Sequence, residues 1–387
     1  MSEPVGAGRA AAEEIALLER HRPVLRYDRQ YDYRAASVLG AVENPGNILR
    51  RFDGEVLARA GGEPALSLEL LAAYPAGLAP RRDDCLAMAP DVLGDARRME
   101  GEERYAGRLY GRVVEDSGRT WLQYWFWLYY NPKNLFGFGK HEGDWELVQL
   151  GLGADGEPEL AAYSQHSSGE TRRFSAGEVQ VEERDGGLHP VVYVASLSHA
   201  AYFEPGTHPY PSGIDHAYGD GPVDFLPVER PGPWVEWPGA WGSSERAIAG
   251  RLGNGPPSPA RQAKWGNPAG FQARLQRRRL RSLIGRALHV LGRATYPLAP
   301  AIEAQVEAGR CLVDYRLNQA RWRRSRHLYL TVHEGDRVIA SRAMRRPPAE
   351  GRAVVLLPRG SRPDAIWATT FNRLRQRSEP AWAAAEG

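Results

Sequence analysis

The feature that most constrains the fold is the run over residues 121–130, where every side chain except Gln123 is aromatic or apolar. A strand-like segment at 105–114 precedes it, and the turn-forming residues 115–119 separate the two. Such a pattern predicts a β-hairpin. Large side chains fall on both faces of the second segment, because successive residues of a strand point to opposite faces. We therefore expect 120–130 to form a central strand covered on both faces.

Other segments extend this pattern along the chain. Residues 144–151 and 189–195 are expected strands, and 272–293 combine apolar residues at helical spacing with many arginines. Short strand-like segments separated by turns follow, as in small β-sandwich domains. The predicted fold is mainly β, with a disordered tail (1–14), a β-sandwich core with long loops (15–270), a basic amphipathic helix (271–300) and a small sandwich-like β domain (301–380).

Charge and cysteine content limit the classes of protein that fit. The net charge of +3 is too small to indicate nucleic-acid binding by itself, and no base-reading motif is present. Cys85 and Cys311 give no disulfide framework, and the N-terminal residues do not resemble a secretory signal. These features predict a cytoplasmic protein. Peripheral contact with a membrane through 272–293 stays open, as an alternative to packing of that helix on the core.

The most informative polar segment follows the aromatic run. It contains His141, Asp144 and Glu146 directly before an expected strand. Alternation places Asp144 and Glu146 on one face of that strand and Trp145 on the other, with His141 in the turn above. Two neighbouring carboxylates repel each other unless a cation lies between them or one takes up a proton. The segment therefore predicts either a divalent-cation site or a solvated, ion-paired turn.

The expected ligand set is two carboxylates and one imidazole. These ligands suit magnesium, calcium or manganese better than a structural zinc, which prefers more sulfur or nitrogen. The metal ligands predicted on this basis are His141, Asp144 and Glu146.

Further side chains are expected to line the same cavity. Two histidines stand where strands end before turns, and large aromatic side chains flank the polar segment. Glu142 and His199 are candidates for a general base, if the protein is an enzyme. The ligand-lining residues predicted are His166, His199, Trp125, Trp145 and Tyr163.

Several motifs occur in an order that resembles a known family. The match covers about residues 15–270 and resembles the vacuolar protein sorting-associated protein 62 family, a group without an established activity that includes bacterial members. The motifs that carry it are Pro23-Val-Leu-Arg-Tyr27, Trp121-Leu-Gln-Tyr-Trp-Phe-Trp127, His141-Glu-Gly-Asp-Trp-Glu146, Tyr163-Ser-Gln-His166 and Pro190-Val-Val-Tyr-Val-Ala-Ser-Leu-Ser-His199.

A more distant resemblance links the polar segment to the necrosis- and ethylene-inducing toxins. Their motif Gly-His-Arg-His-Asp-Trp-Glu matches His141, Asp144, Trp145 and Glu146, whereas Gly143 stands at the second histidine. The resemblance implies a β-sandwich that binds a divalent cation through His141, Asp144 and Glu146 and recognises sphingolipid sugar head groups. The toxins have another aspartate upstream, near Lys133 here, and they are secreted. The metal site therefore transfers better than the toxin activity.

Three functions follow as expectations. The first is cation-dependent binding of a hydroxyl-rich ligand, such as a glycan, a small sugar or a lipid head group. The second is a metal-dependent hydrolase, in which the cation activates water. The third is a membrane-associated trafficking or scaffold protein. The sequence does not decide whether the protein is an enzyme, which cation or ligand it binds, or its oligomeric state.

Overall fold

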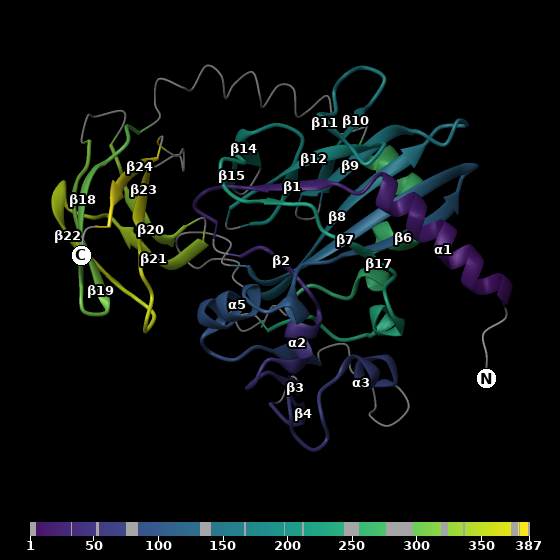
Figure 1. The fold of residues 1–387 in the computed structure, drawn as a ribbon, viewed down its shortest axis with the longest axis horizontal. Coiled ribbons are helices and arrows are strands. Elements are labelled where there is room, and N and C mark those ends of the chain that lie inside the picture. The colour runs from purple at the N-terminus through teal and green to yellow at the C-terminus, as the bar shows by residue number, and fades with distance from the viewer. Residues whose placement is uncertain are drawn as a thin grey trace.

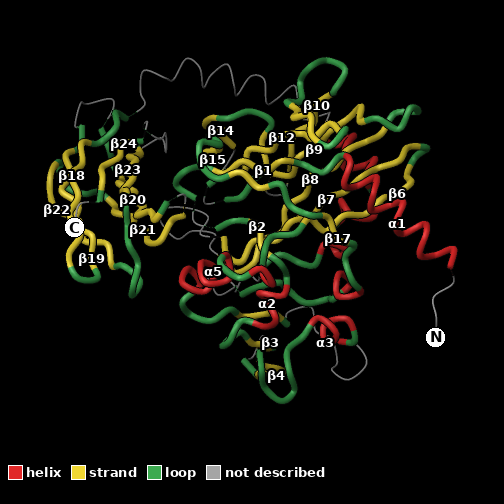
Figure 2. The backbone as a smooth tube through the Cα atoms, in the orientation of Figure 1, coloured by secondary structure: helices red, strands yellow, loops and turns green. Residues whose placement is uncertain are grey.

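The fold was analysed in a computed structural model, in which strands dominate both halves of the chain (Figures 1 and 2). The structure describes residues 5–31, 33–51, 54–74, 84–131, 141–165, 168–196, 198–210, 213–243, 255–275, 297–318, 324–335, 337–372, 378 and 380–385.

An antiparallel sheet built from consecutive strands forms the centre of the larger domain. The longest of these strands, β7, lies between β6 and β8 and is buried along almost its whole length, as its large side chains predict. The strands are β6 (Leu109–Asp116), β7 (Arg119–Asn131), β8 (His141–Leu152), β9 (Pro158–Gln165) and β10 (Ser168–Arg173), with the short β2 (Ala35–Ala36) beside β7 and β17 (Val228–Glu229) parallel to β6.

A second sheet packs face to face on the first and makes the domain a β-sandwich. Its strand β1 (Val24–Tyr27) runs parallel to β12 (Gly187–Val194). Apolar side chains from both sheets, among them Phe126, Val148 and Val192, form one buried core between them. The remaining strands of this sheet are β11 (Val181–Arg184), β13 (Ala201–Tyr202) and β16 (Val223–Asp224); the separate hairpin of β14 (Gly206–Tyr210) and β15 (Gly213–Ala217) lies nearby.

Helices and short strands cover the opposite face of the central sheet. There the odd-numbered residues of β7 and β8, such as Trp127 and Trp145, pack with Trp234 and Trp241 in a second core. The elements on this side are α2 (Leu39–Glu43), β3 (Ile48–Arg50), β4 (Val56–Arg59), α3 (Leu68–Ala72), β5 (Cys85–Ala87), α5 (Val92–Glu100), η1 (Glu103–Tyr105), η2 (Pro233–Glu236), η3 (Pro259–Arg261) and α6 (Ala263–Gly266).

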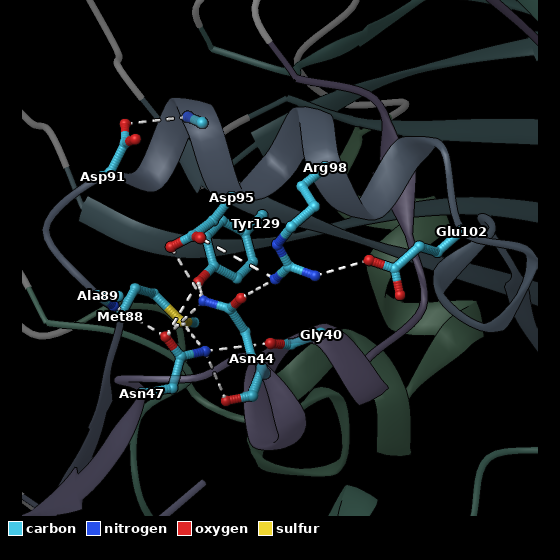
Figure 3. Close-up of polar contacts among 12 residues, drawn as sticks. Gly40, Asn44, Asn47, Met88, Ala89, Asp91, Asp95, Arg98, Glu102 and Tyr129 are labelled. Atoms are coloured by element: carbon cyan, nitrogen blue, oxygen red, sulfur yellow. Dashed lines mark hydrogen bonds and ion pairs between the residues drawn. The ribbon is translucent and has the colours of Figure 1, made fainter. Parts of the chain in front are cut away.

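A saturated polar network lies inside this second layer (Figure 3). The side-chain oxygen of Asn47 accepts hydrogen bonds from the Ala89 amide (2.8 Å) and the Tyr129 hydroxyl (3.0 Å). Its amide nitrogen donates to the carbonyl oxygens of Gly40 (3.1 Å) and Ala41 (3.0 Å). The network therefore ties α2, β7 and the chain after β5 together. Asn44 extends it to the α5 residues Asp95 and Arg98.

The N-terminal segment differs from its prediction. Helix α1 spans Val5–Arg20, and Leu18 is buried in the sandwich core. The disordered tail predicted over 1–14 is therefore wrong from Val5 onward. The alanines and glutamates of this segment favour a helix, and packing of the C-terminal turn on the core adds to that preference.

The C-terminal strands form a second, smaller sandwich, as predicted. Its two sheets enclose an apolar core that includes Val313, Leu330 and Ile366. One sheet contains β18 (Ala301–Glu307), β19 (Arg310–Arg316) and β22 (Glu350–Leu356); the other contains β20 (His327–Glu334), β21 (Arg337–Arg345), β23 (Ala365–Phe371) and β24 (Ala381–Ala384).

The predicted basic helix over 271–300 falls mostly outside the described residues, which stop at 275 and resume at 297. Within the described part, residues 268–275 are helical, and Phe271 and Leu275 are buried in the second core. No helix among the described residues is long and apolar enough to span a membrane.

Candidate functional site

The start of β8 departs from regular alternation at Gly143. This residue has φ of 62°, and a Cβ atom placed there would lie 1.8 Å from the carbonyl oxygen of Trp241. Glycine meets both requirements, because it tolerates positive φ and close approach of another backbone. As a result His141 shares a partner with Asp144: the amide nitrogen of Asn131 donates to Nε2 of His141 (2.9 Å) and to Oδ2 of Asp144 (3.2 Å). Nδ1 of His141 then donates to the Gly143 carbonyl (2.6 Å).

Asp144 is paired with a histidine from the connection between β12 and β13. Nδ1 of His199 donates to Oδ2 of Asp144 (3.1 Å), and the Trp145 amide donates to Oδ1 (2.9 Å). Burial disfavours the charged carboxylate, but the hydrogen bond from His199 and the electrostatic influence of the His141 and His199 imidazoles outweigh it and lower the pKa of Asp144.

The backbone at His199 is unusual. Its φ is 57°, in the left-handed region of backbone conformation that residues other than glycine rarely adopt. Residues held in this way occur often at functional sites, where the surrounding structure maintains them. His199 is only 2% exposed, so its position is set by the elements packed around it.

Glu146 lies two residues beyond Asp144 and behaves differently. It is 3% exposed, and the Ser164 hydroxyl donates a hydrogen bond to its Oε2. Burial, together with the negative charge of Asp144, raises the pKa of Glu146 well above its usual range, although Lys264 and Ser164 act in the opposite direction. The two neighbouring carboxyl groups therefore shift in opposite directions, with the pKa of Asp144 lowered and that of Glu146 raised.

The residues proposed as metal ligands do not form an assembled coordination site in this structure. Among the described residues, no group of three or more His, Cys, Asp or Glu side chains is arranged to hold a metal ion. His141 and Asp144 share Asn131, whereas Glu146 bonds Ser164. His166, predicted to line the same cavity, lies outside the described residues.

The carboxylate of Glu142, a candidate general base, is held by three hydrogen bonds within the protein. Its Oε2 accepts hydrogen bonds from the Met88 amide (2.8 Å), the Ser243 amide (3.1 Å) and the Ser243 hydroxyl (2.7 Å). Burial raises its pKa, and these hydrogen bonds oppose that shift. The side chain joins two loops on the tryptophan-rich side of the sheet, away from the hydrogen bonds of Asp144.

The three aromatic residues predicted to line the ligand cavity are packed in the protein core. Trp125 and Trp145 belong to the tryptophan-rich layer, on the other side of the sheet from the core that contains Tyr163. Tyr163 donates its hydroxyl to the Val191 carbonyl (3.1 Å), and its ring stacks on Phe203 at 3.7 Å. With exposures of 0% for Trp125, 3% for Trp145 and 0% for Tyr163, none offers an open stacking surface. Alternation along β7 and β8 directs both tryptophans into the second core, on the face of the sheet opposite to Tyr163.

The structure adds residues that the sequence prediction did not include. Asn131 and Ser164 hold the two carboxylates, and the positive charge of Lys264 acts on both Glu146 and Asp144. Burial lowers the pKa of Lys264, and the two carboxylates raise it. Lysine is rare in this chain, so Lys264 could have been singled out from the sequence. Nothing in the sequence distinguishes Asn131 or Ser164 in the same way. Asp215 contributes a further negative charge that raises the pKa of Glu146.

Comparisons with known proteins point to one group of structures. No protein-family model matches the chain, and no curated protein matches it. Several solved structures do, all at low identity and low TM-score.

NLPPya in complex with glucosamine is 14% identical over 32% of this chain, with a TM-score of 0.22; the chain spans about half (50%) of that protein. Necrosis and Ethylene inducing Protein 2, from the causal agent of witches' broom disease of cocoa, is 14% identical over 55% of this chain and 72% of its own, with a TM-score of 0.27. The structure described as a toxin fold for microbial attack and plant defense is 13% identical to this chain, over 59% of this chain and 76% of its own, with a TM-score of 0.29. Scores of this size assign no function, and the β-sandwich rests on the two packed sheets themselves.

Proposed function

We propose that this protein binds a divalent cation at the start of β8 and, through that cation, a hydroxyl-rich ligand such as a sugar or a lipid head group. The observation that supports the proposal is the burial of two carboxyl groups, Asp144 and Glu146, two positions apart beside His141. We also propose membership of the vacuolar protein sorting-associated protein 62-like family, on the ordered sequence motifs, and a cytoplasmic location.

The donor atoms fit a hard cation. Carboxylate oxygens and one imidazole nitrogen suit magnesium, calcium or manganese. Burial and the charge of Asp144 raise the pKa of Glu146, and a cation beside both carboxyl groups would act in the opposite direction. His141, Asp144 and Glu146 would hold the ion. When bound, such an ion supplies open coordination positions for ligand hydroxyl groups.

Neighbouring residues position these donors. Asn131 bridges His141 and Asp144, His199 fixes one oxygen of Asp144, and Ser164 holds Glu146. Partners of this kind orient metal ligands, and their loss typically costs about 10- to 100-fold in metal affinity.

One observation favours a second function. His199 is held at Nδ1 by the carboxylate of Asp144, which presents Nε2 as a general base. This arrangement supports a metal-dependent hydrolase in which His199, and not Glu142, takes the proton from water. Peripheral membrane contact through 272–293 stays a proposal from the sequence, because residues 276–293 lie outside the described residues.

The metal content of the purified protein tests the main proposal. We expect about one equivalent of magnesium, calcium or manganese by mass spectrometry, lost in Asp144→Ala. Asp116→Ala is the control, since Asp116 is a β6 carboxylate bound to the Ala269 amide (3.0 Å), on the same sheet. Calorimetry with sugars, with and without chelator, would then identify the ligand.

Absence of metal from both proteins would reject the proposal. If neither protein contains metal and added cations leave the melting temperature unchanged, Asp144 and Glu146 form a structural hydrogen-bond network. Cation-dependent binding and metal-dependent hydrolysis would both then be rejected.

A further inference from the structure

The small C-terminal sandwich lies beside the larger domain and contacts it at β15 (Figure 1). The ring of Phe371, at the end of β23, meets the ring of His216 in β15, with centroids 5.1 Å apart. The guanidinium group of Arg29 lies 4.5 Å above the ring of Trp367 in the same strand. Two aromatic residues of β23 thus contact two segments of the larger domain.

A second set of contacts holds the same junction. Arg97 in α5 donates to the carbonyl oxygen of Ile339 in β21, and Arg337 donates to the carbonyl of Arg97 (3.1 Å). Val338 belongs to the hydrophobic core between the two sheets of the larger domain. Because this junction combines apolar, ring and hydrogen-bond contacts, it fixes the position of the small domain.

Hydrogen bonds connect the junction to His199. The carbonyl of His216 accepts from the backbone amide (2.8 Å) and the hydroxyl (3.3 Å) of Ser196. The same hydroxyl reaches Oδ2 of Asp28 (3.3 Å), next to Arg29. Both segments that the small domain contacts therefore also hold Ser196.

Ser196 begins the turn that carries His199. The His199 amide donates to the Ala195 carbonyl (3.0 Å), and the Ala195 amide donates to the Ala200 carbonyl (2.9 Å). Since His199 has a positive φ, this turn needs outside support to keep its shape. The contacts lead from Phe371 to His216 and from His216 to Ser196. Ala195, the residue before Ser196, accepts the His199 amide, and His199 bonds Asp144.

We propose that the C-terminal domain is a positioning element of the candidate site: docking of Phe371 on His216 holds the turn that presents His199 to Asp144. Ligand occupancy of the site and docking of the domain are then thermodynamically linked, because each favours the same conformation of the turn. The linkage to a ligand rests on the proposed function, whereas the effect on the turn does not.

Hydrogen exchange on the full-length protein tests the effect on the turn. We expect Phe371→Ala to accelerate exchange of the Ala195, Ser196 and His199 amides by about tenfold, and Phe371→Tyr, which keeps a ring at this position, to restore the native rates. The control is Tyr315→Ala, which removes a buried ring from β19, on the far side of the small domain (Figure 1).

Two results would overturn the proposal. One is unchanged exchange at these amides in Phe371→Ala. The other is equal acceleration in Tyr315→Ala while the β20 and β23 amides keep their native exchange rates, because the small domain is then still folded and docked.

Manganese titration of the same proteins adds the binding readout. We expect Phe371→Ala to weaken manganese binding by about tenfold, with no change in Tyr315→Ala. If the wild-type protein binds none of manganese, magnesium and calcium, the proposed function fails while the exchange result still decides the role of the domain. If manganese binds equally to wild type and Phe371→Ala, the linkage is rejected.

Discussion

Two buried polar regions lie on opposite sides of the central sheet, and they differ in the kind of group they contain. The network around Asn44 and Asn47 centres on amide groups and the Tyr129 hydroxyl, whose donors and acceptors match one another, and its charged members Asp95 and Arg98 come from α5 (Figure 3). The site around Asp144 and Glu146 is built on carboxyl groups whose charges oppose each other. Burial of polar groups is therefore no sign of function by itself.

The energetics of the two regions differ for the same reason. A hydrogen bond between neutral groups contributes about 1 kcal/mol net, and a matched network adds such terms without leaving a group unsatisfied. A buried carboxylate without full compensation destabilises the folded state, and burial together with the charge of Asp144 accordingly raises the pKa of Glu146. The first region stabilises the fold, whereas burial of the second has a free-energy cost that the proposed cation would reduce.

Removal of Asn47 should give the largest effect. In Asn47→Ala the Gly40 and Ala41 carbonyls and the Ala89 amide lose their partner inside the protein. We expect a loss of about 4 kcal/mol in the free energy of unfolding, measured by urea denaturation.

An exposed asparagine provides the control for that variant. Asn267 accepts from the Gly270 amide (2.7 Å) at the start of a helix, and Asn267→Ala should cost only about 1 kcal/mol. Cation binding should be unchanged in folded Asn47→Ala. A loss of stability no larger than that of Asn267→Ala would show that the network is not a main source of stability.

The pH dependence of stability should come from buried titratable groups and not from the asparagine network. At the domain junction His333 is 1% exposed, and burial together with the charge of Arg29 lowers its pKa to about 4. Arg97 adds to this shift, while Asp364 and Asp220 oppose it. Between pH 6.5 and about 4 the unfolded chain binds a proton that the folded chain does not, so stability falls as the pH drops through this window.

The size of this effect can be measured with one substitution. The shift corresponds to a loss of about 3 kcal/mol by pH 4, and none further below it. In His333→Asn the slope between pH 6.5 and 4 should flatten, because this variant has no imidazole at the buried position. Parallel slopes in wild type and His333→Asn would assign the acid sensitivity to other groups.

Much of the fold was predictable from local pattern. Alternation placed Trp145 opposite Asp144 and Glu146, and the two cores confirm it: Trp145 packs with Trp241, while Val148, on the face of Glu146, packs between the sheets. The small C-terminal sandwich likewise followed from short apolar segments between turns. These features depend on neighbouring residues alone.

The site was less predictable, because its details depend on contacts between distant segments. The carbonyl oxygen of Trp241 approaches Gly143 closely, at the point where the alternation of β8 breaks. Trp241 is distant in sequence, so no local pattern predicts this contact. His199 was predicted near the site from its strand end, but its bond to Asp144 requires the second sheet. Trp125 was taken for a ligand surface because composition alone does not separate a core tryptophan from an exposed one.

A smaller effect of opposite sign should come from Glu146. Its pKa in the folded state lies well above that of the unfolded chain, so above pH 4.5 stability falls as the pH rises. Glu146→Gln keeps the size of the side chain and its bond to Ser164 without the charge. We expect this variant to be more stable than wild type by about 2 kcal/mol at pH 8 without metal, and equal to it near pH 4.5. Glu159→Gln, at an exposed ion pair with Arg119, should change stability by less than about 1 kcal/mol.

A divalent cation should reverse that order. A ligand that binds only the folded state stabilises it in proportion to its affinity, so wild type should gain stability on addition of manganese while Glu146→Gln should not. The two regions would then differ in both respects. Asn47→Ala would only lower stability, whereas Glu146→Gln would raise stability without metal and abolish cation binding. Equal stability of Glu146→Gln and wild type at pH 8 would show instead that Lys264 and Ser164 already compensate the carboxylate, and that no burial cost is left for a cation to reduce.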